Sequence, residues 1–203
     1  MTGTGRATRP ALFLRGNAML RRFLDSIYAT GLWGACLAMI AIAVLVFAQI
    51  IGRMIDRVLI LSGAAPLGLA IPSLSDFGGF LFVAAATLAL PATLRAAGHV
   101  RVTLTLALAG PRVGRFLTVL VLVLALGMAG FAAWHSAAQM WDSWSFNVVS
   151  FGMVKVPLWV PQAVMTTGFA LLVLALADEL LAALRGADPA FRKAEAERST
   201  GEH

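Results

Sequence analysis

The chain has 203 residues, of which 60% are hydrophobic and 13% charged, and its mean hydropathy of +0.85 excludes an ordinary soluble domain. Its net charge of +6 comes from basic residues at the ends of apolar runs. That pattern indicates membrane topology and phospholipid contact rather than nucleic-acid binding. A single cysteine, Cys36, excludes a disulfide framework and a CxxC metal site.

Residues 1–31 form a basic segment with five arginines and one acid, Asp25, and are expected to be cytoplasmic. Within it, Leu14–Tyr28 is predicted to form a short amphipathic helix on the inner leaflet. The apolar run 32–51 follows. At about 1.5 Å per residue it can cross a hydrocarbon core of about 30 Å, and it lacks a convincing cleavage site for a secretory signal. We therefore predict an uncleaved first transmembrane helix.

The long connection between the first two spans, residues 53–76, is expected to begin as a helix. Arg53, Asp56 and Arg57 share one helical face, which predicts an interfacial amphipathic piece. The pair Ser62-Gly63 should end it, and the glycines and prolines beyond predict an irregular segment. Asp76 falls in the first turn of the next helix, where a carboxylate suits the helix dipole.

Three further spans are predicted at residues 77–94, 116–134 and 160–177, so that a four-helix membrane domain occupies residues 32–184. The connection 134–159 contains four of the five tryptophans, which favours a place at the membrane–water interface on the outer side of the bilayer. The mixed-charge tail 185–203 is predicted to be cytoplasmic and disordered. The expected fold class is an all-α integral membrane protein with four transmembrane helices and short interfacial amphipathic helices.

The sidedness follows from a basic hinge, residues 94–115, which carries four arginines and no acid. Placing this hinge in the cytoplasm puts 13 of the 16 Lys and Arg residues inside. The positive-inside rule then predicts that both termini are cytoplasmic.

The sequence offers little material for a catalytic site. Phosphate-binding glycine motifs are absent, and the four predicted spans contain no ionisable residue. Two histidines on opposite sides of one haem are not available, because His99, His135 and His203 fall in separate regions. We therefore predict a chain that is not an enzyme and that serves another membrane component.

Four short motifs resemble a known family. They are a Gln49-x-x-x-Arg53 end to the first span, Ser75-Asp76 at the start of the second, the hinge Gly98-His99-Val100-Arg101-Val102, and Val156-Pro157-Leu158-Trp159 before the fourth. Together they resemble the small permease subunit, or DctQ-like Q subunit, of tripartite ATP-independent periplasmic (TRAP) transporters. The similarity covers about residues 20–185.

This resemblance implies secondary active transport in the bacterial inner membrane. A large permease subunit, the M subunit, would carry the substrate and sodium sites, and a periplasmic binding protein would deliver an organic acid. The small subunit would scaffold the large one and bind no cofactor itself. The residues expected to contact the partner or membrane phospholipid are Gln49, Arg53, Asp76, Gly98, His99, Arg101 and Trp159.

An alternative from another functional class is the membrane-anchor subunit of a redox enzyme complex, which would hold haem or quinone. A small transporter that works alone is a third possibility. The lack of ionisable residues in the predicted spans argues against the latter, as does the lack of an internal repeat.

Overall fold

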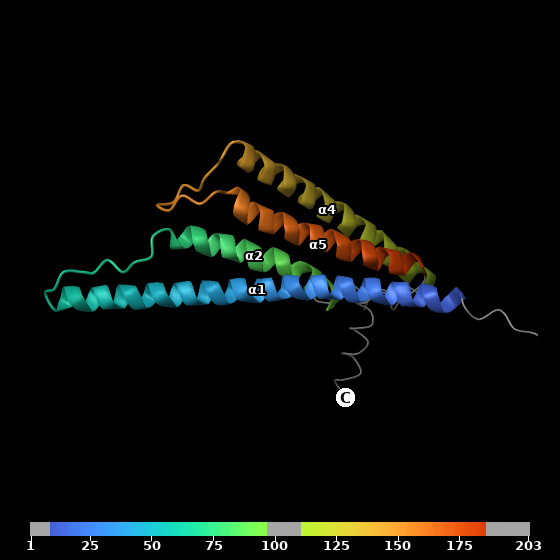
Figure 1. Cartoon of the computed structure of the whole chain (residues 1–203), viewed down its shortest axis with the longest axis horizontal. Coiled ribbons are helices and arrows are strands. Elements are labelled where there is room, and N and C mark those ends of the chain that lie inside the picture. Colours follow the sequence, from blue (N-terminus) through green and yellow to red (C-terminus); the bar gives the residue numbers. More distant parts are fainter. Residues whose placement is uncertain (1–8, 97–110, 186–203) are drawn as a thin grey trace, which may run out of the picture.

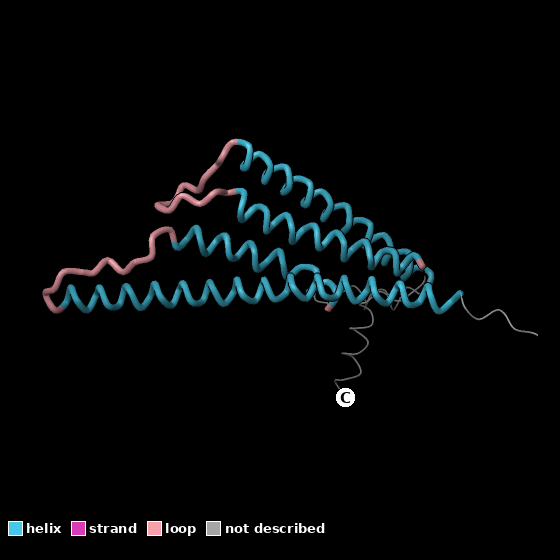
Figure 2. Tube along the Cα trace, in the orientation of Figure 1, coloured by secondary structure: helices cyan, strands magenta, loops and turns pink. Residues whose placement is uncertain are grey.

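The computed structural model describes residues 9–96 and 111–185. Four helices make up most of this part, namely α1 (Arg9–Leu61), α2 (Leu74–Arg95), α4 (Pro111–Ser145) and α5 (Trp159–Leu184), and no strand longer than an isolated bridge occurs in it (Figure 2). Each helix contains a stretch that is long and apolar enough to cross a membrane. The predicted fold class, an all-α membrane protein with four spanning helices, is confirmed.

Helix α1 is a single helix of 53 residues, about 80 Å long at 1.5 Å per residue. It contains the expected helix Leu14–Tyr28, the first predicted span and the amphipathic piece after Arg53, which are therefore continuous rather than separate (Figure 1). The helix ends at Leu61, so that Ser62-Gly63 terminates it as the sequence predicts. Gly63 has a positive φ of 79°, a backbone conformation that glycine adopts at little cost.

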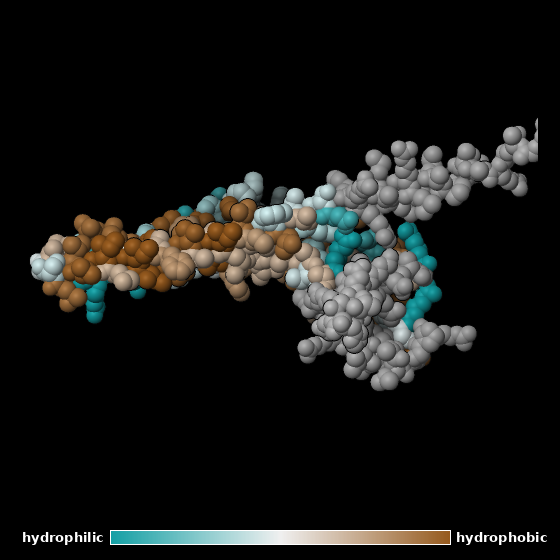
Figure 3. All heavy atoms as spheres, turned by 90° about the horizontal axis from the view of Figure 1, so that it is seen from below, coloured by the Kyte–Doolittle hydropathy of each residue, from teal (hydrophilic) through white to brown (hydrophobic). Residues whose placement is uncertain are grey.

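The four helices lie side by side in the order α1, α2, α5, α4. Figure 1 shows them as a fan that converges near the C-terminal ends of α2 and α5. Figure 3, which is turned by 90° from that view, shows the row as a narrow band. Because each helix in a row has at most two close neighbours, only 17% to 28% of the residues in the apolar stretches are buried. The chain therefore presents broad apolar surfaces, which lipid or a membrane partner can cover.

Helix α2 packs against its two neighbours through glycines. A Cβ added at Gly31 of α1 would lie 3.1 Å from the carbonyl oxygen of Leu88. One added at Gly168 of α5 would lie 2.6 Å from Cβ of Thr87 and 2.8 Å from its carbonyl oxygen. Small residues at such crossings let helix backbones approach closely, which is a main source of packing energy inside a bilayer.

We expect Gly168→Ala to destabilise the chain by about 1–3 kcal/mol, because the new methyl group would overlap the backbone of Thr87. The melting temperature in detergent should fall by roughly 3–10 °C. Gly127→Ala on α4 is the matched control, since a Cβ there meets no atom within 4 Å. Equal melting temperatures for the two variants would contradict the close α2–α5 contact.

Candidate functional site

The C-terminal end of α1, which the predicted topology places on the outer side, holds the connection 62–73 through the side chain of Asp56. One carboxylate oxygen of Asp56 accepts hydrogen bonds from the backbone N–H groups of Leu67 and Gly68, at 2.9 and 3.2 Å, and the other accepts one from Leu69 at 3.1 Å. Gly68 adopts a positive φ of 70°, which helps to turn successive N–H groups towards one anion. The charge of Asp56 is thus compensated within the chain.

Two further residues of α1 complete this contact. The Gln49 side-chain oxygen accepts a 2.6 Å hydrogen bond from the backbone N–H of Ile71, and Gln49 is only 7% exposed. Between the two polar residues, Gly52 lets the connection approach, because a Cβ there would lie 2.8 Å from the carbonyl oxygen of Leu69. We call Gln49, Gly52 and Asp56 the outer clasp. Gln49, predicted as a partner contact, is therefore occupied inside the chain.

Arg53 lies beside the outer clasp and is exposed. Among the residues whose side chains the structure describes, neither Arg53 nor Arg57 forms an ion pair, and Asp56 is bound to backbone N–H groups instead. Asp76 lies elsewhere, at the start of α2. The two arginines therefore remain available to phospholipid or to a partner on the outer side of the predicted topology.

The start of α2 contacts the connection between α4 and α5. The hydroxyl oxygen of Ser73 accepts a 3.0 Å hydrogen bond from the backbone N–H of Val154. A Cβ at Gly152 would overlap the carboxylate of Asp76, so the absence of a side chain there lets the carboxylate lie against the loop backbone. Ser73 thus bonds to this connection with the Asp76 carboxylate beside it, whereas Asp56 bonds to the connection between α1 and α2.

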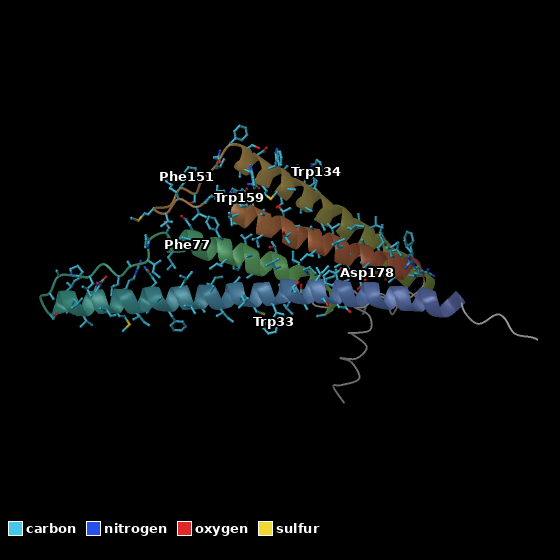
Figure 4. All side chains as sticks on the ribbon, in the orientation of Figure 1. Trp33, Phe77, Trp134, Phe151, Trp159 and Asp178 are labelled. Carbon is cyan, nitrogen blue, oxygen red and sulfur yellow. The ribbon has the colours of Figure 1, made fainter. Side chains whose placement is uncertain are left out.

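The α4–α5 connection is itself a small hairpin. The N–H of Ser150 donates to the carbonyl of Val156 at 2.8 Å, and the N–H of Leu158 donates to the carbonyl of Val148 at 3.0 Å. The Ser150 hydroxyl adds a bond to the carbonyl of Val154 and accepts one from the N–H of Val156. These bonds leave Phe151 at the tip almost fully exposed (Figure 4).

Trp159, another predicted contact residue, opens α5 and packs on Trp144 near the end of α4, with 5.0 Å between the ring centroids. Trp134, Trp141 and Trp144 on α4 are all largely exposed. Indole rings favour the membrane interface, which supports an interfacial position for this end of the fold. Trp159 joins α4 to α5 and is only partly available to another chain.

A polar cluster at the opposite end of the row was missed in the sequence. Arg95, the last residue of α2, forms an ion pair with Asp25 of α1, and its guanidinium lies 5.2 Å from the ring centroid of Tyr28. On α5, which continues to Leu184 beyond the predicted span, Glu179 is only 2% exposed. The available signal was the isolated acid Asp25 in an otherwise basic segment, facing the first arginine of the hinge.

Helix α4 is tied to the same end, since Arg115 donates a 3.0 Å hydrogen bond to the carbonyl oxygen of Leu184 at the end of α5. A cation at a helix C-terminus also interacts favourably with the helix dipole. Three candidate residues of the hinge, Gly98, His99 and Arg101, lie outside the described residues, so their roles stay predictions.

The chain matches the model of one protein family, described as tripartite ATP-independent periplasmic transporters, DctQ component, over residues 42–186. This range contains α2, α4, α5 and residues 42–61 of α1, and with them all seven candidate contact residues. No curated protein matches the chain significantly.

We expect Asp56→Ala to release the connection 62–73 from α1, because three backbone N–H groups would lose their acceptor. Amide hydrogen exchange at Leu67, Gly68 and Leu69 should accelerate by about tenfold or more, as expected for the loss of 1–3 kcal/mol of local stability. The matched control is Arg57→Ala, one residue along, which should leave these amides unchanged. Similar exchange in both variants would argue against the outer clasp.

Proposed function

Because the chain belongs to the DctQ component family of TRAP transporters, we propose that it is a non-catalytic small membrane subunit that scaffolds the large permease subunit. The transporter would take up an organic acid that a periplasmic binding protein delivers, coupled to an ion gradient. The family match over residues 42–186 is the observation that carries this proposal. Sodium coupling would reside in the large subunit, with no cofactor bound by this chain.

The use of the polar side chains supports a structural role. Gln49, Asp56 and Ser73 accept hydrogen bonds from the two connections, and Asp25 and Arg95 join α1 to α2 at the other end. In the described part of the chain, no three His, Cys, Asp or Glu residues come together as metal ligands could. The polar groups named above thus hold helices and loops together, as expected for a structural subunit.

The flat arrangement suits a scaffold. A row of four helices extends laterally in the bilayer, and both of its ends are tied by hydrogen bonds or ion pairs between elements. A large subunit that moves its substrate site across the membrane needs a part that stays fixed relative to the lipid. A row of helices attached to that fixed part would enlarge the area over which it contacts lipid.

The proposed topology places both termini and the basic hinge in the cytoplasm of a bacterial cell, with the protein in the inner membrane. The outer clasp and the tryptophan-rich end of α4 would then face the periplasm, where the binding protein delivers substrate. The hinge arginines would bind inner-leaflet phospholipid or acidic groups of the large subunit.

Purification of the full chain from its native membrane in a mild detergent tests the proposal. We expect one large multi-span permease to co-purify and to be identified by mass spectrometry. In reconstituted vesicles, the large subunit and the binding protein should transport an organic acid only when this chain is present. A flavin or iron–sulfur partner, or undiminished transport without this chain, would contradict the proposal.

The hinge provides a second test. We expect Arg101→Glu and Gly98→Leu to lower both uptake and recovery of the complex, because the first reverses a charge at the inner leaflet and the second adds bulk to the hinge. Arg198→Glu, a matched charge reversal in the C-terminal tail, should leave both unchanged. Normal uptake by both hinge variants would remove the hinge from the proposed interface.

A further inference from the structure

Helix α1 carries an unpartnered apolar stripe along the edge of the row. Starting at Trp33, eight alternating steps of four and three residues each reach another large apolar side chain and end at Leu61, which gives nine such residues in all. The stripe begins Trp33, Leu37, Ile40, Val44 and continues through Phe47 and Ile51. All nine side chains are at least 55% exposed. We call these nine residues the outer seam.

The opposite face of α1 is the one that the chain itself covers. Gly31, Ala35 and Ala38 are buried there, and Gln49 and Gly52 hold the outer connection further along. This face repeats with the same steps of three and four residues, and four of its eight positions from Tyr28 to Gly52 hold glycine or alanine. Helix α1 thus has a closed face rich in small residues and an open face of large ones, and Figure 4 shows Trp33 directed away from α2.

The outer seam is too long for lipid alone. From Trp33 to Leu61 it covers about 42 Å at 1.5 Å per residue, whereas the hydrocarbon core is about 30 Å thick. A usual tilt of about 20° shortens its projection only to about 39 Å. Figure 3, which views the molecule from the α1 side, shows hydrophobic residues reaching the end of the row. Part of the outer seam would therefore contact water or headgroups unless a protein covers it.

The residues beside the outer seam favour a helix as the covering element. A repeat of 3.5 residues is the spacing by which two helices pack knobs into holes along their length. As far as Ala48 its flanking positions hold small residues, Ala41 and Ala48 on one side and Cys36 and Ala43 on the other, whereas Ile50, Ile55 and Arg57 flank the remainder. Small flanks let a second backbone approach closely, which lipid tails do not require.

We propose that the outer seam binds one long transmembrane helix of the large permease subunit, packed along α1 at a shallow crossing angle. The proposal rests on the proposed function and adds the surface through which it is exerted. The partner helix would carry small residues opposite Trp33 and Phe47 and an acidic residue near Arg57.

A second copy of this chain fits the outer seam less well. Two copies with the same membrane orientation would pair their α1 helices in parallel, so Trp33 and Phe47 would each meet their own counterpart in one crowded layer. In such a parallel pair, Arg57 of one copy would lie opposite the residue five positions further along the other copy. That residue is Ser62, which is not an acid. A different chain can supply complementary sizes and charge.

The first test places wedges beside the outer seam in the full complex. Ala43→Phe and Ala48→Phe should each lower recovery of the large subunit by about tenfold, because a bulky flank prevents the close approach of a helix. Ala138→Phe, the same change at an exposed position of α4, should leave recovery at the wild-type level. Wild-type recovery from both wedge variants would overturn the proposal.

A second measurement does not depend on the folding of the wedge variants. A photo-crosslinking amino acid at Val44 should attach the large subunit in native membranes, whereas one at Ala138 should not. A Cys36–Cys36 disulfide dimer formed on mild oxidation would instead assign the seam to a second copy and overturn the proposal. If the wild-type chain recovers no large permease at all, it is the proposed function that fails rather than the choice of face.

Discussion

The fold depends on how closely helix backbones approach α2. In a bilayer, lipid is as apolar as the side chains, so helices associate through packing and interhelical polar contacts rather than through the hydrophobic effect. Thr87 and Leu88 of α2 meet Gly168 of α5 and Gly31 of α1, one on each side. These contacts place α2 between two neighbours and produce a row, in which α4 can pack only on the free side of α5.

Polar interactions stabilise the two ends of this row. At one end, Asp56 and Gln49 hold one connection, and Ser73 holds the other. At the opposite end, Asp25 and Arg95 join α1 to α2. The middle of the membrane needs few polar contacts because each helix satisfies its own backbone. Fixed ends and a simply packed middle are suited to a part that remains still while another subunit moves.

Hydropathy and charge were enough to predict the four spanning helices and the end of α1 at Ser62-Gly63, because both depend on local composition. The order of the row was not predictable, since the glycines at the crossings differ from other helix glycines only in what they meet. Asp56 was interpreted as part of an amphipathic face, although it binds the backbone N–H groups of Leu67, Gly68 and Leu69. Every residue except proline has a backbone N–H group, so the pattern of side chains does not show which of these groups an acid will bind. The burial of Glu179 was missed for the related reason that its depth depends on neighbouring helices.

The two faces of α1 show why hydropathy alone understates the information in this sequence. Between Gly31 and Ala48, α1 is apolar on all sides, yet residue size separates the closed face at Gly31 and Ala35 from the open face at Trp33 and Leu37. Size matters because the closed face must admit a backbone, whereas the open face supplies knobs for a partner. Leu61 is 80% exposed and lies at the end of a helix that is longer than the bilayer is thick. Contact with lipid tails alone therefore does not account for an apolar side chain at this position. A surface of this length and regularity is best explained by a second helix that runs beside it.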